Sequence, residues 1–271
     1  GLWWGILIGL VFVVILGLLV GIPTLRLRAD YLAIVTIAMA EIVRLVVRSV
    51  RFKEYFGGSD GINGFSRSFR DLSPFNPAAQ YGIRPFRYSG YSFWTIIVGW
   101  SLVALFSLLV FMLMKSPWGR VVKAIREDED AVRSLGKNVY SYKMQSLIIG
   151  GAIGMFSGMI FALDRGSVQP DNYSRDVTFY ILTALVLGGV AKVRGSVVGP
   201  MMFWALYVFS DNFLRELTKN QPFEVFGFGL IQKSQVGPVN YMLIGLGLML
   251  LMTFRPQGVF GSKEEMALDG R

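Results

Sequence analysis

The sequence has 271 residues, 53% of them apolar, a formal net charge of +9, and neither Cys nor His. The lack of Cys and His excludes thiolate and imidazole metal ligands, nucleophiles of either type and a Ser-His-Asp triad. A mean hydropathy of +0.50 indicates a membrane protein. Its basic residues are then expected in the loops at the membrane surface and not in a nucleic-acid interface. Because the first residue is Gly1 and not Met, we expect a longer natural sequence.

Two apolar segments lie before residue 48. Leu2–Val20 is uncharged and has the roughly 20 residues that a bilayer requires, so we predict a membrane span that ends at the following Gly and Pro. Tyr31–Val47 is a second candidate of barely sufficient length, and it contains Glu41 and Arg44 on one helical face. Ionisable side chains at membrane depth are costly in lipid. The two are therefore expected to face protein and to pair.

A polar connection and a third span follow. Residues 48–91 are rich in Gly, Pro, Ser and Arg, and they include a Gly-rich run at 56–64. This composition predicts a loop region. Ser92–Met114 is again uncharged, and its length predicts a span that crosses the bilayer with some tilt.

The most informative segment is 115–143, because two antiparallel helices need only a few connecting residues. Ser116 and Pro117 favour a helix start, Ser as a cap and Pro as the first helical residue. Four acidic residues at 127–130 precede Arg133 and Gly136, an order that favours a short helix ended by Gly. A compact helix outside the membrane that a soluble partner could grip is one interpretation. A solvated amphipathic loop is the other.

Four further apolar segments complete the chain and bring the predicted number of membrane segments to about seven. Val177–Val190 is too short for a full crossing and predicts a half-helix, whereas Val197–Leu214 and Val239–Phe254 can span. Met144–Leu163 predicts a span with three glycines at four-residue spacing, which we expect to pack against another helix: Gly150, Gly154 and Gly158.

Basic residues in the short connections predict the orientation in the membrane. Two connections carry such pairs and are predicted to be cytoplasmic: Arg26 with Arg28, and Lys192 with Arg194. Alternation then places 115–143 and the tail 255–271 inside, and 48–91 outside. The bias is not uniform, because the predicted external loop also holds seven basic residues: Arg48, Arg51, Lys53, Arg67, Arg70, Arg84 and Arg87.

The segment Asp130–Gly136 reads Asp-Ala-Val-Arg-Ser-Leu-Gly. It resembles the Glu-Ala-Ala, three residues, Gly signature of the membrane subunits of bacterial ABC importers, with Asp for Glu and Val for the second Ala. Members of the related family of LivM-type branched-chain amino acid permeases usually carry additional hydrophobic segments before the equivalent of Leu2. Motifs similar to that family cover nearly the whole chain in the expected order: Leu25–Thr36, Glu41–Leu45, Gly57-Gly58 with Gly61-Ile62, Ser116–Arg120, Ala124–Glu129, Leu187–Gly189 with Gly195-Ser196 and Gly199-Pro200, and Phe254–Gly261.

The resemblance implies an all-α polytopic membrane protein with one permease domain over 1–271, in a bacterial or archaeal cytoplasmic (inner) membrane. Its function would be the ATP-driven import of branched-chain amino acids. The implied partners are a second, LivH-like permease subunit, two ATP-binding cassette subunits, an extracytoplasmic solute-binding protein and membrane lipid. The chain has no P-loop, since Gly136-Lys137 is followed by Asn138, so ATP with Mg²⁺ would bind to partners. This chain would bind no cofactor or metal and would not be an enzyme.

The resemblance also implies roles for particular residues. One interpretation places Thr36, Glu41 and Arg44 near the translocation path. The favoured interpretation is that Glu41 and Arg44 form a structural ion pair. The Gly-rich external segment would contact the binding protein, line the outer mouth or be a flexible turn: Gly57, Gly58, Gly61 and Asn63. The segment that would couple to the ATPase comprises Glu127, Asp128, Glu129, Asp130, Ala131, Val132, Arg133, Ser134, Leu135 and Gly136.

Three alternatives differ in class or substrate. A permease subunit for urea or short amides shares the same subunit pattern. An ion-coupled secondary transporter would show several buried acids and broken helices, and Glu41 alone supports it weakly. An intramembrane enzyme would need a nucleophile and base or a metal cluster within the spans, and the spans offer none.

Overall fold

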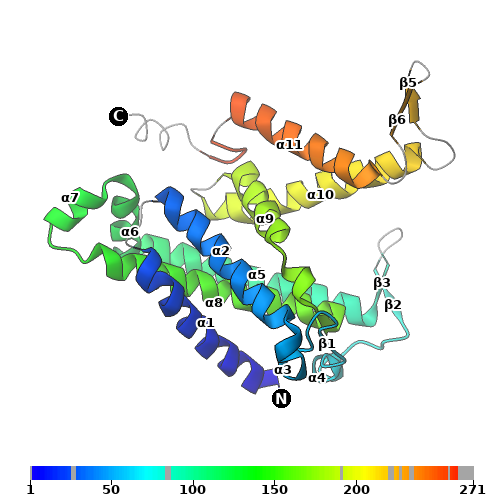
Figure 1. The fold of residues 1–271 in the computed structure, drawn as a ribbon, viewed down its shortest axis with the longest axis horizontal. Helices are drawn as coiled ribbons and strands as arrows, with labels where there is room; N and C mark the ends of the chain where they lie inside the picture. Colours follow the sequence, from blue (N-terminus) through cyan, green and yellow to red (C-terminus); the bar gives the residue numbers. More distant parts are fainter. Residues whose placement is uncertain are drawn as a thin grey trace. The chain divides into compact units, whose positions relative to one another are not determined.

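The computed structural model describes residues 2–25, 29–82, 87–189, 192–218, 223–225, 228–231, 235–255 and 257–261. The chain divides into two compact units, Gly1–Arg175 and Asp176–Arg271 (Figure 1). The predicted cytoplasmic pair Arg26 and Arg28, the basic residue Arg84 and the end of the tail, 262–271, lie outside the described residues.

Five helices in the described part of the chain are long and apolar enough to cross a membrane. They expose large apolar side chains over most of their surface; the best apolar window of α5, for example, contains no buried residue. A helix that is apolar on all sides but uncovered by protein requires a lipid environment. These helices are α1 (Leu2–Thr24), α5 (Gly90–Lys115), α8 (Val139–Arg165), α10 (Val193–Leu217) and α11 (Val236–Phe254).

The predicted number of seven spans is not confirmed. The second candidate forms the 20-residue helix α2 (Ala29–Arg48), which lacks a sufficiently apolar window because Glu41, Arg44 and Arg48 interrupt it. The predicted half-helix forms α9 (Arg175–Gly188), with 14 residues or about 21 Å of rise. The first span does not end at its Gly and Pro, because α1 continues through Pro23 to Thr24.

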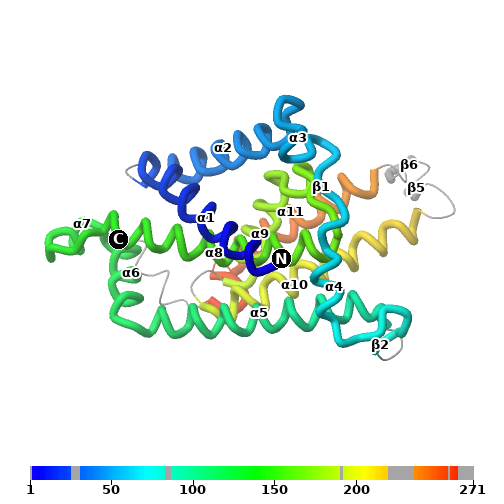
Figure 2. The backbone as a smooth tube through the Cα atoms, turned by 90° about the horizontal axis from the view of Figure 1, so that it is seen from below, coloured from blue at the N-terminus to red at the C-terminus, as the bar shows by residue number. Residues whose placement is uncertain are grey.

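In the first unit, α1 packs antiparallel against α8 through small residues (Figure 2). A Cβ atom on Gly9 would meet Met155, and one on Gly21 would lie 2.8 Å from the sulfur of Met144. The close helix approach therefore uses the glycines of α1 and not the predicted stripe of α8. At Gly150 and Gly154, no described residue comes within 4 Å of an added Cβ, so the expected packing there is not found.

The two ends of the first unit carry different elements. At one end lie α6 (Pro117–Glu127) and α7 (Glu129–Ser134), which are together called the α6–α7 segment. The opposite end, the β1 end, holds most of the region that was predicted as a loop, and it contains short elements with defined pairing. These are η1 (Val50–Phe52), α3 (Lys53–Phe56), β1 (Ile62–Asn63), α4 (Arg67–Asp71), β2 (Gln80–Tyr81), β3 (Tyr88–Ser89), β4 (Ser167–Val168) and η2 (Pro170–Tyr173); β1 pairs with β4 and β2 with β3, both antiparallel.

The second unit contains α9, α10, α11 and the antiparallel strands β5 (Phe223–Val225) and β6 (Phe228–Ile231). Asn240 of α11 is fully buried, and its side-chain oxygen accepts a hydrogen bond from the Ser210 hydroxyl of α10 at 2.8 Å. The ring of Tyr180 joins α9 to both helices by contacting four other aromatic rings: Phe203, Trp204, Tyr207 and Tyr241.

Candidate functional site

The helix α6 begins where the sequence predicts. The Ser116 hydroxyl accepts the Gly119 N–H, and Pro117 occupies the first helical turn, where it needs no hydrogen-bonded N–H. The apolar positions Val121, Val122 and Ile125 are half-buried, and the helix contacts α5 and α8. The α6 helix is therefore packed onto the ends of two candidate spans.

The helix α7 is delimited by local capping on both sides. An Asp128 carboxylate oxygen accepts the backbone N–H groups of Asp130 and Ala131, each at 2.9 Å. At the other end, Gly136 has a φ of 75°, and the N–H groups of Gly136 and Lys137 donate to carbonyls of the last turn. This is the glycine-terminated helix end that the sequence predicted.

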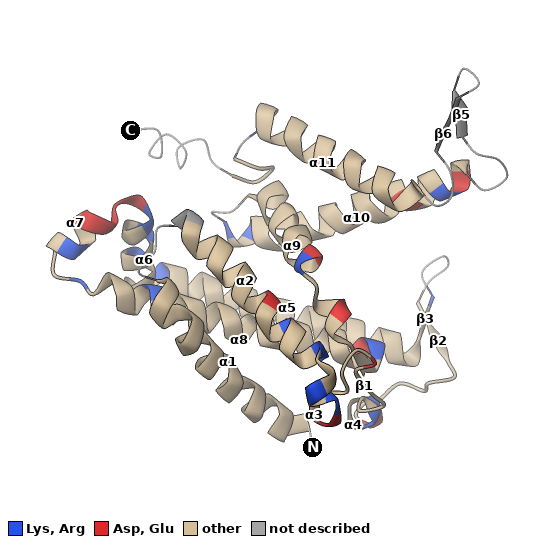
Figure 3. Cartoon of the chain, in the orientation of Figure 1, with Lys and Arg blue, Asp and Glu red and all other residues tan. Residues whose placement is uncertain are grey.

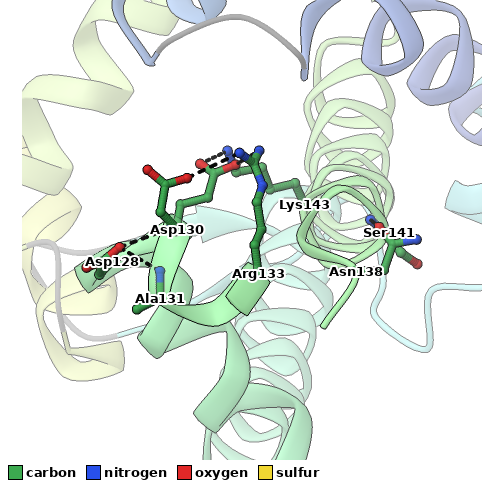
Figure 4. A network of polar contacts seen from close by, with 8 residues as sticks. Asp128, Asp130, Ala131, Arg133, Asn138, Ser141 and Lys143 are labelled. Atoms are coloured by element: carbon green, nitrogen blue, oxygen red, sulfur yellow. Dashed lines mark hydrogen bonds and ion pairs between the residues drawn. The ribbon is translucent and has the colours of Figure 1, made fainter. Parts of the chain in front are cut away.

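One ion-pair network ties α7 to α8 (Figure 4). The Glu129 carboxylate accepts from Arg133 within α7 and from Lys143 in the first turns of α8, both at 2.5 Å. The side chains of Lys143 and Glu129 are only 28% and 31% exposed, and Val132 of α7 is 5% exposed. Lys143 marked only the end of the charged segment in the sequence, and no helical spacing relates it to Glu129.

The same network lines an open pocket of about 370 Å³ together with Tyr140 and with Leu25 at the end of α1. The end of α1 therefore lies at the same end of the first unit as α7. In contrast, Asp130 is 91% exposed at its side chain, and Leu135 is 77% exposed. The α7 helix thus has one face anchored to the bundle and one face open to a partner.

A second network lies at the β1 end of the first unit. Glu41 and Arg44 form a bidentate ion pair, with nitrogen–oxygen distances of 2.6 and 3.0 Å. Asp171 in η2 joins them, at 2.8 Å from Arg44 and 3.2 Å from Arg48. The network thus lies in the last turns of α2 and links it to a segment 127 residues away. Asp171 was missed because no pattern in the sequence relates it to α2.

Thr36 is not part of this network. Its hydroxyl donates to the backbone carbonyls of Leu32 and Ala33, one turn earlier in α2. Such local bonding satisfies a hydroxyl on an apolar helix without a further partner.

The network at Asp171 yields a testable stability difference. We expect Asp171→Ala to destabilise the protein by about 1 kcal/mol, because two arginines lose the acid that joins α2 to η2. The matched control is Asp60→Ala, whose partner Lys53 is 57% exposed, and we expect a change below about 0.5 kcal/mol. Hydrogen–deuterium exchange of residues 167–173 should rise only in the first variant, and equal exchange in both would contradict the link.

The predicted external glycines lie in a paired segment. Asn63 of β1 pairs with Ser167, and the Gly64 N–H donates to the Gly166 carbonyl at 3.0 Å. A Cβ atom on Gly61 would lie 2.0 Å from the Val168 carbonyl oxygen, so only glycine allows this approach. Gly57 and Gly58 also have positive φ and form the end of α3.

The β4–η2 segment is in turn held against α8. The Tyr173 hydroxyl donates to the Gly158 carbonyl at 3.1 Å, and burial raises the pKa of this phenol. The phenol is therefore neutral and a hydrogen-bond donor at physiological pH.

Three of the glycine-containing motifs meet in the second unit. A Cβ on Gly188 at the end of α9 would lie 2.0 Å from the Gly195 carbonyl oxygen and 2.8 Å from the Gly199 Cα of α10. The segment after α11 joins them, because the N–H groups of Val259 and Phe260 donate to the Leu187 and Gly188 carbonyls at 2.9 and 3.2 Å. These bonds satisfy carbonyls that a helix end leaves without partners. We call this contact the glycine junction.

The described part of the chain contains no group of three acidic side chains arranged to hold a metal ion. Five lipid-requiring helices and a small charged helix fixed to one end of a bundle define a multi-pass α-helical membrane protein. The sequence matches the family described as branched-chain amino acid transport system, permease component, over residues 1–254. The chain belongs to this family.

The chain is similar to several curated transport proteins. It is 30% identical over 253 residues to the high-affinity branched-chain amino acid transport system permease protein LivM of Salmonella typhimurium, which covers 90% of this chain and 53% of that protein. It is 28% identical over 270 residues to the probable LivM of Methanocaldococcus jannaschii, covering 96% and 69%. The fructose import permease protein FrcC of Rhizobium meliloti is 30% identical over 151 residues, covering 55% and 37%.

The chain thus spans about half the length of the Salmonella relative. No solved structure shows a significant match. The LivM proteins and FrcC, to which the chain is similar, are all named as transport permeases.

Proposed function

We propose that this chain is the membrane-spanning permease subunit of an ATP-driven importer of branched-chain amino acids in a bacterial or archaeal cytoplasmic membrane. The observation that carries the proposal is the family match over residues 1–254, supported by LivM relatives that cover 90% or more of the chain. The partners would be a second, LivH-like permease subunit, two ATP-binding cassette subunits and an extracytoplasmic binding protein. ATP with Mg²⁺ would be bound by the cassette subunits.

In this proposal, the α6–α7 segment faces the cytosol and α7 is the contact with an ATP-binding cassette subunit. Its open face offers the exposed Asp130, Arg133 and Leu135. Its anchored face joins α8 through Glu129 and Lys143. Closure of the cassette pair on ATP would displace α7, and the link would pass this displacement to α8 and thus alternate the access of the pathway.

The β1 end then faces the exterior. Gly57, Gly58, Gly61 and Asn63 would form part of the surface that receives the binding protein, and the pairing of β1 with β4 supports a preformed surface. Glu41 and Arg44 would act as a structural ion pair, since each already has a charged partner at hydrogen-bond distance. The hydroxyl proton of Thr36 is donated within its own helix, so this side chain could offer a solute only its acceptor lone pairs.

The experiment is uptake by the reconstituted complex. The full-length protein, a second permease subunit and two cassette subunits encoded beside it should be reconstituted in proteoliposomes and supplied with the adjacent binding protein. We expect uptake of labelled leucine that requires ATP and the binding protein. Uptake driven by an ion gradient without cassette subunits would overturn the proposal. Uptake of fructose or urea but not of leucine would contradict the proposed substrate.

A further inference from the structure

The two helices of the α6–α7 segment carry exposed charges of opposite sign. The exposed basic residues of α6 are Arg120, Lys123 and Arg126, and α7 begins with a run of acidic residues (Figure 3). At about 100° per residue, the spacing of three places the basic side chains within an arc of about 120° on one face of α6. The apolar residues occupy the opposite face, so α6 is strongly amphipathic.

The basic face of α6 is not neutralised by the described residues. Within the described part of the chain, Arg120, Lys123 and Arg126 form no ion pair. Glu127 at the end of α6 reduces the local charge by one and leaves it positive. In contrast, Glu129 and Asp130 of α7 are paired with Arg133 or Lys143. The unpaired cations of the segment are thus concentrated on α6.

The helix α6 lies next to the end of a candidate membrane span. The helix starts only one residue after α5, a candidate span whose last residue is Lys115. Its half-buried apolar side packs on α5 and α8, and the indole N–H of Trp118 donates to Gln145 at 2.7 Å. Basic side chains next to the end of a membrane span are attracted to the anionic headgroups of the adjacent leaflet.

We propose that Arg120, Lys123 and Arg126 bind anionic phospholipid headgroups of the leaflet from which α5 emerges. The attraction holds α6 against the membrane, and the same negative surface repels the acidic start of α7, which keeps the open face of α7 directed to solvent. The binding rests only on the membrane location of the chain, whereas its effect on transport also rests on the proposed function. An acidic surface of a cassette subunit is the competing partner.

The direct test measures lipid binding by the purified full-length protein. Native mass spectrometry in detergent, with titration of phosphatidylglycerol or phosphatidylcholine, should show a preference for the anionic lipid of about tenfold. The triple variant Arg120→Gln, Lys123→Gln and Arg126→Gln should lose this preference at an unchanged melting temperature. The matched control removes three basic residues of the β1 end, Arg51→Gln, Arg67→Gln and Arg87→Gln, and should retain it. Unchanged lipid preference in the α6 variant would overturn the proposal.

A second measurement separates lipid from protein as the partner. The wild-type complex should show ATP hydrolysis several-fold higher in vesicles with phosphatidylglycerol than in pure phosphatidylcholine, and the α6 variant should not distinguish the two lipids. An α6 variant that binds lipid normally but no longer co-purifies with the cassette subunits would assign the basic face to protein and overturn the proposal. If the complex proves not to transport leucine, the lipid titration still tests the inference by itself.

Discussion

Gly188→Ala at the glycine junction is expected to destabilise the protein by about 3 kcal/mol, lowering its melting temperature by roughly 6–12 °C. The added Cβ would lie 2.0 Å from the carbonyl oxygen of Gly195, a backbone atom that cannot rotate away as a side chain would. The clash can be relieved only if α9 moves away from α10. This movement would also lengthen the hydrogen bonds that Val259 and Phe260 donate to the end of α9. Thermal unfolding of the detergent-solubilised protein, followed by size-exclusion fluorescence, measures the effect.

The matched control for Gly188 is Gly245→Ala in α11. No described atom lies within 4 Å of a Cβ at this position, and Ala favours a helix over Gly by about 1 kcal/mol. The melting temperature of this variant should stay constant or rise. Equal melting temperatures for the two variants would show that the close approach at the junction does not limit stability.

Lys143→Glu is expected to lower ATP-dependent uptake about tenfold under the proposed function. A charge pair at contact distance is worth about 4 kcal/mol at an effective dielectric constant of 20, and partial exposure reduces this to on the order of 1–2 kcal/mol. The substitution replaces attraction to Glu129 by repulsion, so α7 should leave its docked position about tenfold more often. Uptake and ATP hydrolysis by the reconstituted complex are the measurements.

The reversed pair provides the control for Lys143→Glu. In the double variant Glu129→Lys with Lys143→Glu, the carboxylate introduced on α8 can accept from the ammonium introduced on α7, so most of the uptake should return. A double variant as inactive as the single one would mean that the identity of each residue, and not the link between helices, supports transport. Raised salt should weaken wild-type coupling, since the pair is partly exposed.

Under the proposed function, the packing of the first unit would transmit a displacement of α7 to the bundle. The α8 helix receives α7 at its first turns and contacts α1 along its length through Gly9, Gly17 and Gly21. Close backbone approach leaves little room for sliding, so α8 and α1 should move together. At the other end, Asp171 and Tyr173 tie the segment after α8 to α2 and to α8 itself. A displacement at α7 would therefore reach the β1 end through a packed unit.

The sequence by itself determined those features that depend on neighbouring residues. Long, mainly apolar runs were sufficient to predict α1, α5, α8, α10 and α11, because the bilayer sets a minimum length for each span. The limits of α7 were also predictable, since Asp128 and Gly136 satisfy the helix ends locally. The pairing of Glu41 with Arg44 follows from their spacing on one helix.

Tertiary structure alone decided the contacts between segments that are distant in the chain. The sequence contains Lys143, Asp171 and the glycines of the junction, but nothing in their spacing indicates which partners they meet. It also predicted helix packing at Gly150 and Gly154, where no other described residue comes close, and missed the packing at Gly21. Local patterns determine which faces can pack or pair, whereas the arrangement of whole helices determines which faces do. The links of α7 to α8, of α2 to η2 and of the tail to α9 all belong to this second kind.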